Sequence, residues 1–119
     1  MKNRPFVERT GFALAGLKTA WRQERSLRTQ SYIALCLIPV MFWLQPSPLW
    51  WSLIGVLAVL VLAAELFNTA LENLADRLHP EIHPQIKLAK DCSAGAVLLV
   101  SLGALWVAGW MIIDSLTVS

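Results

Sequence analysis

Two long stretches without charge divide the chain. No charged side chain occurs in residues 29–64 or in residues 92–113. A helix needs about 20 apolar residues to cross the ~30 Å hydrocarbon core of a membrane, so the second stretch fits one span. The first stretch is long enough for two spans, and residues 45–48, which read Q-P-S-P, form a turn-like cluster within it. The pattern therefore predicts an all-α integral membrane protein with three transmembrane helices.

An amphipathic segment precedes the first span. Over about residues 6–23, aromatic and aliphatic side chains are interspersed with Arg and Lys at helical spacing. Such a helix lies in the membrane interface with its apolar face buried, or packs on the rest of the protein, and the pattern allows both. We expect the spans at about residues 30–45, 49–78 and 85–113, the second with a cytoplasmic extension, in a single membrane domain over residues 1–119.

Composition and charge placement set the expected orientation. The chain is 56% hydrophobic and 15% charged; seven of its ten Lys and Arg residues precede the first span, and three lie between the second and third. The positive-inside rule then places the N-terminus in the cytoplasm. A nucleic-acid partner is not expected, because these cations are well placed to contact anionic lipid. We also expect no cleavable signal peptide, since no small-residue cleavage site follows the first apolar run.

Carboxylates recur on one face of the second span. At 100° per residue, Glu65, Glu72 and Asp76 fall within about 40° of one another, and Asn68 lies about 40° outside that group. A helix from residue 49 to residue 64 rises only about 24 Å, less than the ~30 Å core, so Glu65 is expected at or just inside the membrane boundary. A carboxylate at that depth costs a few kcal/mol unless it is paired, protonated or bound to a cation.

The acid stripe formed by Glu65, Glu72 and Asp76 allows two kinds of chemistry. Mg²⁺ usually takes one or two carboxylates together with phosphate oxygens and water, so a row of oxygen ligands suits it. An acid at the interface could also act as a general base toward a lipid hydroxyl. Glu72 and Asp76 are equally compatible with an ordinary solvated helix surface, whereas a structural role does not account for Glu65.

The third helix opens with Lys87, Lys90 and Asp91. Helix N-termini favour anions, so these cations do not complement the macrodipole. They are well placed for the phosphates of ATP, which a helix N-terminus also attracts; interfacial anchoring explains Lys87 equally well. We discount His79 and His83 as a metal-ligand pair, because a proline follows each of them and no helical face presents both.

These segments together resemble the signature of the prokaryotic diacylglycerol kinase family, which includes the undecaprenol kinases. The similar positions are E-L-F-N-T-A-L-E at residues 65–72, then Asp76, then A-K-D at residues 89–91, and the likeness extends over nearly the whole chain. The resemblance implies a homotrimer in the bacterial inner membrane, with active sites built from neighbouring subunits at the cytoplasmic face. It implies transfer of the γ-phosphate of ATP, with Mg²⁺, to a lipid hydroxyl.

The resemblance also assigns roles to individual residues. They are Glu65 as catalytic base, Glu24 and Glu72 as metal ligands, Lys90, Asp91 and Asp76 at the nucleotide, and Asn68 as a supporting polar group. Without the resemblance, Glu24 reads as part of a surface ion pair, because three arginines lie close to it in sequence.

Several positions depart from the diacylglycerol kinase pattern. The sequence at residues 24–28, 68–70 and 94–98 is closer to that of the undecaprenol kinases. This similarity favours a polyprenol as the acceptor and leaves diacylglycerol as an open alternative. A small proton-coupled transporter is an alternative, but Glu65 is expected near the end of its helix and not at the midplane that alternating access requires. A non-catalytic membrane subunit is a further alternative, and it leaves the acid stripe unexplained.

Overall fold

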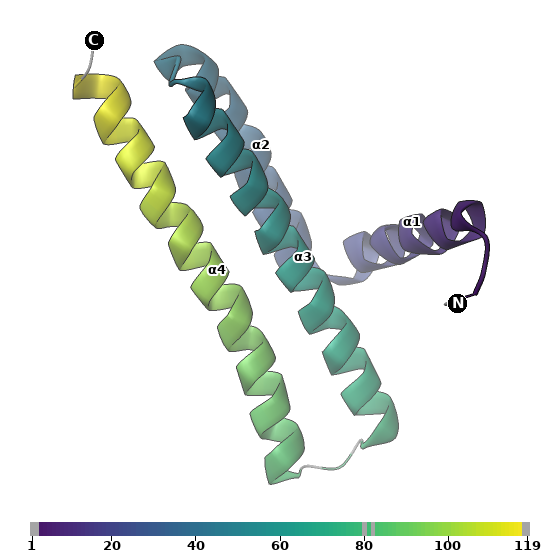
Figure 1. Ribbon diagram of the computed structural model, residues 1–119. Coiled ribbons are helices and arrows are strands. Elements are labelled where there is room, and N and C mark those ends of the chain that lie inside the picture. Colours follow the sequence, from purple (N-terminus) through teal and green to yellow (C-terminus); the bar gives the residue numbers. More distant parts are fainter. Residues whose placement is uncertain (1–2, 80, 82, 118–119) are drawn as a thin grey trace.

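A computed structural model describes residues 3–79, 81 and 83–117 of the chain. This part forms four helices: α1 (Phe6–Gln23), α2 (Arg25–Leu44), α3 (Pro48–Leu78) and α4 (Pro84–Thr117). Three of them, α2, α3 and α4, are long and apolar enough to cross a membrane. They form a bundle from which α1 projects sideways (Figure 1). The predicted class, an all-α membrane protein with an amphipathic N-terminal helix and three spans, is confirmed.

A tight turn joins α2 to α3. Gln45 adopts the left-handed conformation that ends many helices, with φ of 50° and ψ of 56°, and its N–H bonds the Met41 carbonyl at 2.8 Å. Pro48 then occupies the first turn of α3, where its missing N–H costs no hydrogen bond. At this end of the bundle, Trp50 Nε1 donates to Asp114 Oδ2 at 2.9 Å, which ties the start of α3 to the end of α4.

Most of the large apolar side chains face outward. Phe42 and Trp106, for example, are 66% and 69% exposed, whereas the buried core near the α2–α3 turn consists of Met41, Ile54 and Met111. Helices that are apolar all round are typical of membrane spans, whose outer surface contacts lipid. Burial within the bundle therefore accounts for little of the apolar surface, and α4 packs mainly along α3.

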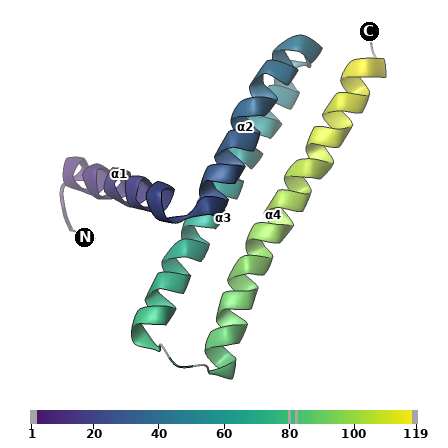
Figure 2. The ribbon, with the colours of Figure 1, turned by 180° about the vertical axis from the view of Figure 1, so that it is seen from behind.

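The chain breaks sharply between α1 and α2. Glu24 has an extended backbone, with φ of −107° and ψ of 107°. Arg28 Nη1 donates to the carbonyl oxygens of Trp21 at 2.6 Å and Arg22 at 3.0 Å, which are among the groups that the end of α1 leaves without helical partners. These bonds link the first turn of α2 to the end of α1, and α1 leaves the bundle sideways at this break (Figure 2).

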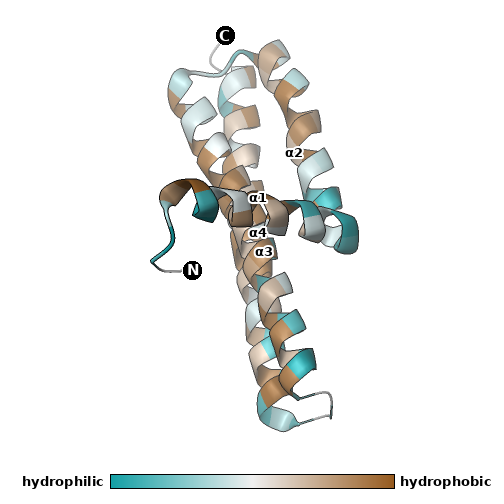
Figure 3. Cartoon of the chain, turned by 90° about the vertical axis from the view of Figure 1, so that its right-hand side faces the viewer, coloured by the Kyte–Doolittle hydropathy of each residue, from teal (hydrophilic) through white to brown (hydrophobic). Residues whose placement is uncertain are grey.

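The level of α1 separates an apolar part of the bundle from a polar extension. The C-terminal half of α1 contacts α3 around Leu66 and Thr69, and both α3 and α4 continue past it into a more hydrophilic region (Figure 3). In the structure α2 starts at Arg25, before the expected start near residue 30, and α4 continues to Thr117. Of the expected domain, residues 1–2, 80, 82 and 118–119 lie outside the described residues.

Candidate functional site

Glu65 is buried between the helices, with 4% of its surface exposed. Its Oε1 accepts a hydrogen bond from the Ser26 hydroxyl of α2 at 3.2 Å. One turn further along α3, the Thr69 hydroxyl donates to the main-chain carbonyl of Glu65 at 2.9 Å and is also buried. Because a carboxylate loses much of its hydration on burial, it needs such partners, and its carboxylate therefore faces α2 and not the surrounding lipid.

A polar pocket of about 350 Å³ surrounds this carboxylate. Polar side chains of α2, α3 and α4 line the pocket together with small or aliphatic residues of α4. The lining residues are Ser26, Gln30, Glu65, Asn68, Ala94, Val97, Leu98 and Ser101. Within the described part of the chain, Asn68 Oδ1 is buried and has no hydrogen-bond partner. Since buried acceptors are rarely left unpaired, this atom is available to a ligand or a bound ion.

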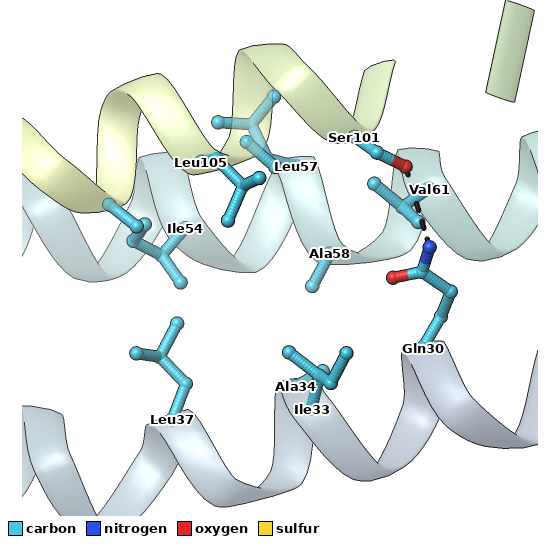
Figure 4. Close-up of a pocket in the computed structure, with 12 residues that line it drawn as sticks. Gln30, Ile33, Ala34, Leu37, Ile54, Leu57, Ala58, Val61, Ser101 and Leu105 are labelled. Carbon is cyan, nitrogen blue, oxygen red and sulfur yellow. Dashed lines mark hydrogen bonds between the residues drawn. The ribbon is translucent and has the colours of Figure 1, made fainter. Parts of the chain in front are cut away.

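An apolar cavity of about 250 Å³ adjoins this pocket on the side of the α2–α3 turn. Gln30 and Ser101 line both spaces, and Gln30 Nε2 donates to Ser101 Oγ at 3.5 Å where they meet. Figure 4 shows Leu37 of α2 and Ile54 of α3 pointing toward each other across the cavity. The site is thus polar at one end and lined by hydrocarbon at the other, as an amphipathic ligand requires.

An ion pair joins the polar extensions of α3 and α4. Lys90 Nζ lies 2.5 Å from Asp76 Oδ1, and Lys87 Nζ lies 2.7 Å from Asp91 Oδ2 along α4. Lys87, Asp91 and Asp76 are largely exposed and the Lys90 side chain is 34% exposed, and pairs open to solvent contribute only about 0–1 kcal/mol to stability. The fold thus brings Lys90 and Asp76, two of the residues expected at the nucleotide, together across α3 and α4.

The two acids expected to bind a metal differ in position. Glu24 lies at the break between α1 and α2, and Glu72 lies on α3 two turns beyond Glu65; both are partly buried. Among the described residues, no three His, Cys, Asp or Glu side chains gather as a metal-ligand set. Mg²⁺ bound with a nucleotide needs only one or two carboxylates, because phosphates and water supply the rest. The carboxylates and the unpaired Asn68 oxygen suit such an ion.

Reasoning from the sequence missed three polar residues of this pocket. Gln30 and Ser101 could have been found, because isolated polar side chains within membrane helices usually mark contacts between helices. Ser26 gave no such signal, since it lies among three arginines and reads as part of a solvated helix start.

Comparison with known proteins identifies the family. A family model described as prokaryotic diacylglycerol kinase matches residues 11–112. The chain belongs to this family. The predicted family is thereby confirmed, as is the expected enzyme class, a phosphotransferase with an alcohol acceptor.

Three relatives, each named diacylglycerol kinase, extend the comparison. The protein of Haemophilus influenzae is 33% identical over 84% of this chain and 86% of its own length. That of Pseudomonas aeruginosa is 37% identical over 82% of this chain and 80% of its own length. That of Synechocystis is 32% identical over 88% of this chain, which spans only 61% of that relative.

Proposed function

We propose that the protein is an ATP-dependent lipid kinase at the cytoplasmic face of the bacterial inner membrane. It transfers the γ-phosphate of ATP to the hydroxyl of undecaprenol or diacylglycerol, giving undecaprenyl phosphate or phosphatidic acid. The observation that carries this proposal is the buried Glu65 carboxylate, which lies in a polar pocket beside an apolar cavity. Family membership supports a lipid kinase.

Glu65 acts as the general base. The acceptor hydroxyl enters the polar pocket while its hydrocarbon chain occupies the apolar cavity beyond Gln30 and Ser101. As the lipid oxygen attacks the γ-phosphorus, the free carboxylate oxygen of Glu65 takes the hydroxyl proton. A new phosphorus–oxygen bond forms, the bond between the γ-phosphorus and the bridging oxygen breaks, and ADP leaves with that oxygen.

The nucleotide binds beside the polar ends of α3 and α4, where Asp76 and Lys90 lie. Lys90 supplies positive charge for the phosphates. Asp76, which pairs with Lys90 across the two helices, and Asp91, which pairs with Lys87 along α4, are the further residues of the nucleotide site. Glu24 and Glu72, assisted by the Asn68 oxygen, would hold Mg²⁺. When bound, this ion neutralises charge on the phosphate oxygens.

The protein acts as a homotrimer of single-domain chains. The resemblance to the prokaryotic diacylglycerol kinases, which implies active sites built from neighbouring subunits, supports this assembly. The outward-facing apolar surface of the bundle also leaves room for contacts between copies. The excess of Lys and Arg before α2 supports a cytoplasmic N-terminus.

A phosphate-transfer assay tests the proposal. Purified protein in mixed micelles is given ATP labelled in the γ-phosphate, with undecaprenol or diacylglycerol in parallel reactions. We expect label to enter at least one lipid with Mg²⁺, and EDTA to reduce transfer to background, because the phosphate charge is then no longer neutralised. Failure to label either lipid contradicts the proposal, and the ratio of the two rates identifies the acceptor.

Filling the apolar cavity should weaken acceptor binding. Ala104 lines the cavity from α4, so Ala104→Phe is expected to raise the KM for the lipid about 10-fold, the effect of about 1.4 kcal/mol, and to leave the KM for ATP unchanged. Ala96→Phe is the matched control, because this exposed residue lies on the same helix but outside the cavity lining. Equal lipid KM values for the two variants would contradict this location of the acceptor chain.

A further inference from the structure

Ser26 connects two helices at the Glu65 carboxylate. It lies in the first turn of α2, directly after the break at Glu24, and its hydroxyl donates to Glu65 Oε1 at 3.2 Å. The contact joins residues 39 positions apart in sequence. Because Ser26 is bound to one carboxylate oxygen, the other oxygen remains free to accept a proton from a ligand.

The neighbouring donors are engaged elsewhere. The Thr69 hydroxyl donates to the main-chain carbonyl of Glu65 and not to its carboxylate. The Gln30 amide donates to Ser101. In the part of the chain that the structure describes, Ser26 is therefore the side chain that donates a hydrogen bond to the carboxylate group of Glu65.

The position of Ser26 is itself fixed by the break between α1 and α2. Arg28, half a turn further along α2, bonds two carbonyl oxygens at the end of α1. The backbone N–H of Arg28 also donates to the Glu24 carbonyl at 3.3 Å, across the first turn of α2. These bonds of Arg28 tie the first turn of α2 to Glu24 and to the end of α1, and from that turn the Ser26 hydroxyl is directed at Glu65 of α3.

We propose that Ser26 is a positioning residue for phosphate transfer, which acts by holding the Glu65 carboxylate in the orientation that accepts the lipid proton. The inference rests on the proposed kinase function. A Glu side chain without this bond can rotate about its terminal torsions, and misplacement of a reacting group by about 1 Å can cost about 10²-fold in rate. Ser26 is absent from the lining of the apolar cavity and is therefore not placed to bind the acceptor chain.

Graded substitutions of Ser26 test this role. Ser26→Ala is expected to lower kcat about 10- to 100-fold, with the KM values for ATP and lipid within about 2-fold of wild type, because binding is retained and only alignment is lost. Ser26→Thr should restore kcat to within about 3-fold, since it keeps the hydroxyl. Ser26→Cys should fall between the two, because a thiol is a weak donor.

Ser31→Ala is the matched control. Ser31 lies on the same helix, and its hydroxyl bonds only the Leu27 carbonyl within α2, at 2.9 Å, so the variant should keep wild-type kcat. Thermal unfolding in micelles accompanies each assay. Wild-type kcat in Ser26→Ala, or equal loss in the Ala and Thr variants, overturns the inference. Absence of transfer by the wild-type protein refutes the kinase proposal instead.

Discussion

Glu65→Gln is expected to lower kcat for phosphate transfer by about 10²- to 10⁴-fold, the contribution of a positioned general base. The substitution keeps the size of the side chain and an oxygen that can accept the Ser26 hydrogen bond, so the packing around it should persist. It removes the group that takes the proton from the lipid hydroxyl. The KM for ATP should change little, because the expected nucleotide residues lie near the end of α3 and the start of α4.

The control for this experiment is Glu8→Gln. Glu8 lies on α1 and faces Arg4 at 3.6 Å in an exposed ion pair, which makes a small contribution to stability. The same chemical change there should leave kcat within about 2-fold of wild type. Both variants are assayed in mixed micelles with labelled ATP after their helix content is compared by circular dichroism. Normal turnover by a folded Glu65→Gln protein would contradict the assignment of Glu65 as the general base.

Lys90→Ala is expected to lower kcat/KM for ATP by about 10²- to 10³-fold. A cation held at a transferring phosphate stabilises charge in the transition state, and removal of one such group typically has an effect of this size. If the pair of Lys90 and Asp76 only joined two helix surfaces, its loss would cost about 0–1 kcal/mol of stability and leave ATP kinetics nearly unchanged. Steady-state kinetics with varied ATP separate the two roles.

A charge swap provides the control for Lys90. The double variant Lys90→Asp with Asp76→Lys restores an ion pair between α3 and α4 but moves the cation to the other helix. It should unfold near the wild-type temperature and remain defective in ATP use. Recovery of wild-type kcat/KM in the swapped protein would show that the pair matters and that the position of the cation does not, which contradicts a phosphate-binding role.

The sequence predicted most of the fold because the membrane imposes strict length and polarity requirements. A lipid core offers no hydrogen bonds to the backbone, so charge-free stretches of sufficient length must be helices. The sequence also predicted the turn at residues 45–48 and the amphipathic segment before α2, because each is determined by residues that are close in sequence. The rise of a helix counted from residue 49 likewise leads us to expect Glu65 near the membrane boundary.

The sequence located the acidic stripe, but not the contacts of its members. Periodicity places Glu65, Glu72 and Asp76 on one face of α3 without saying what that face meets. Family resemblance assigned the role of Glu24, whose neighbours in sequence suggested a surface ion pair. These roles remain proposals that the variants above test.

The tertiary structure decided which side chains meet across helices. Three features each involve different helices: the burial of Glu65 against Ser26, the pairing of Lys90 with Asp76, and the polar pocket beside an apolar cavity. Their formation depends on how α2, α3 and α4 are rotated and tilted against one another. The periodicity of a single helix fixes which residues share a face, whereas the packing of several helices fixes what that face contacts.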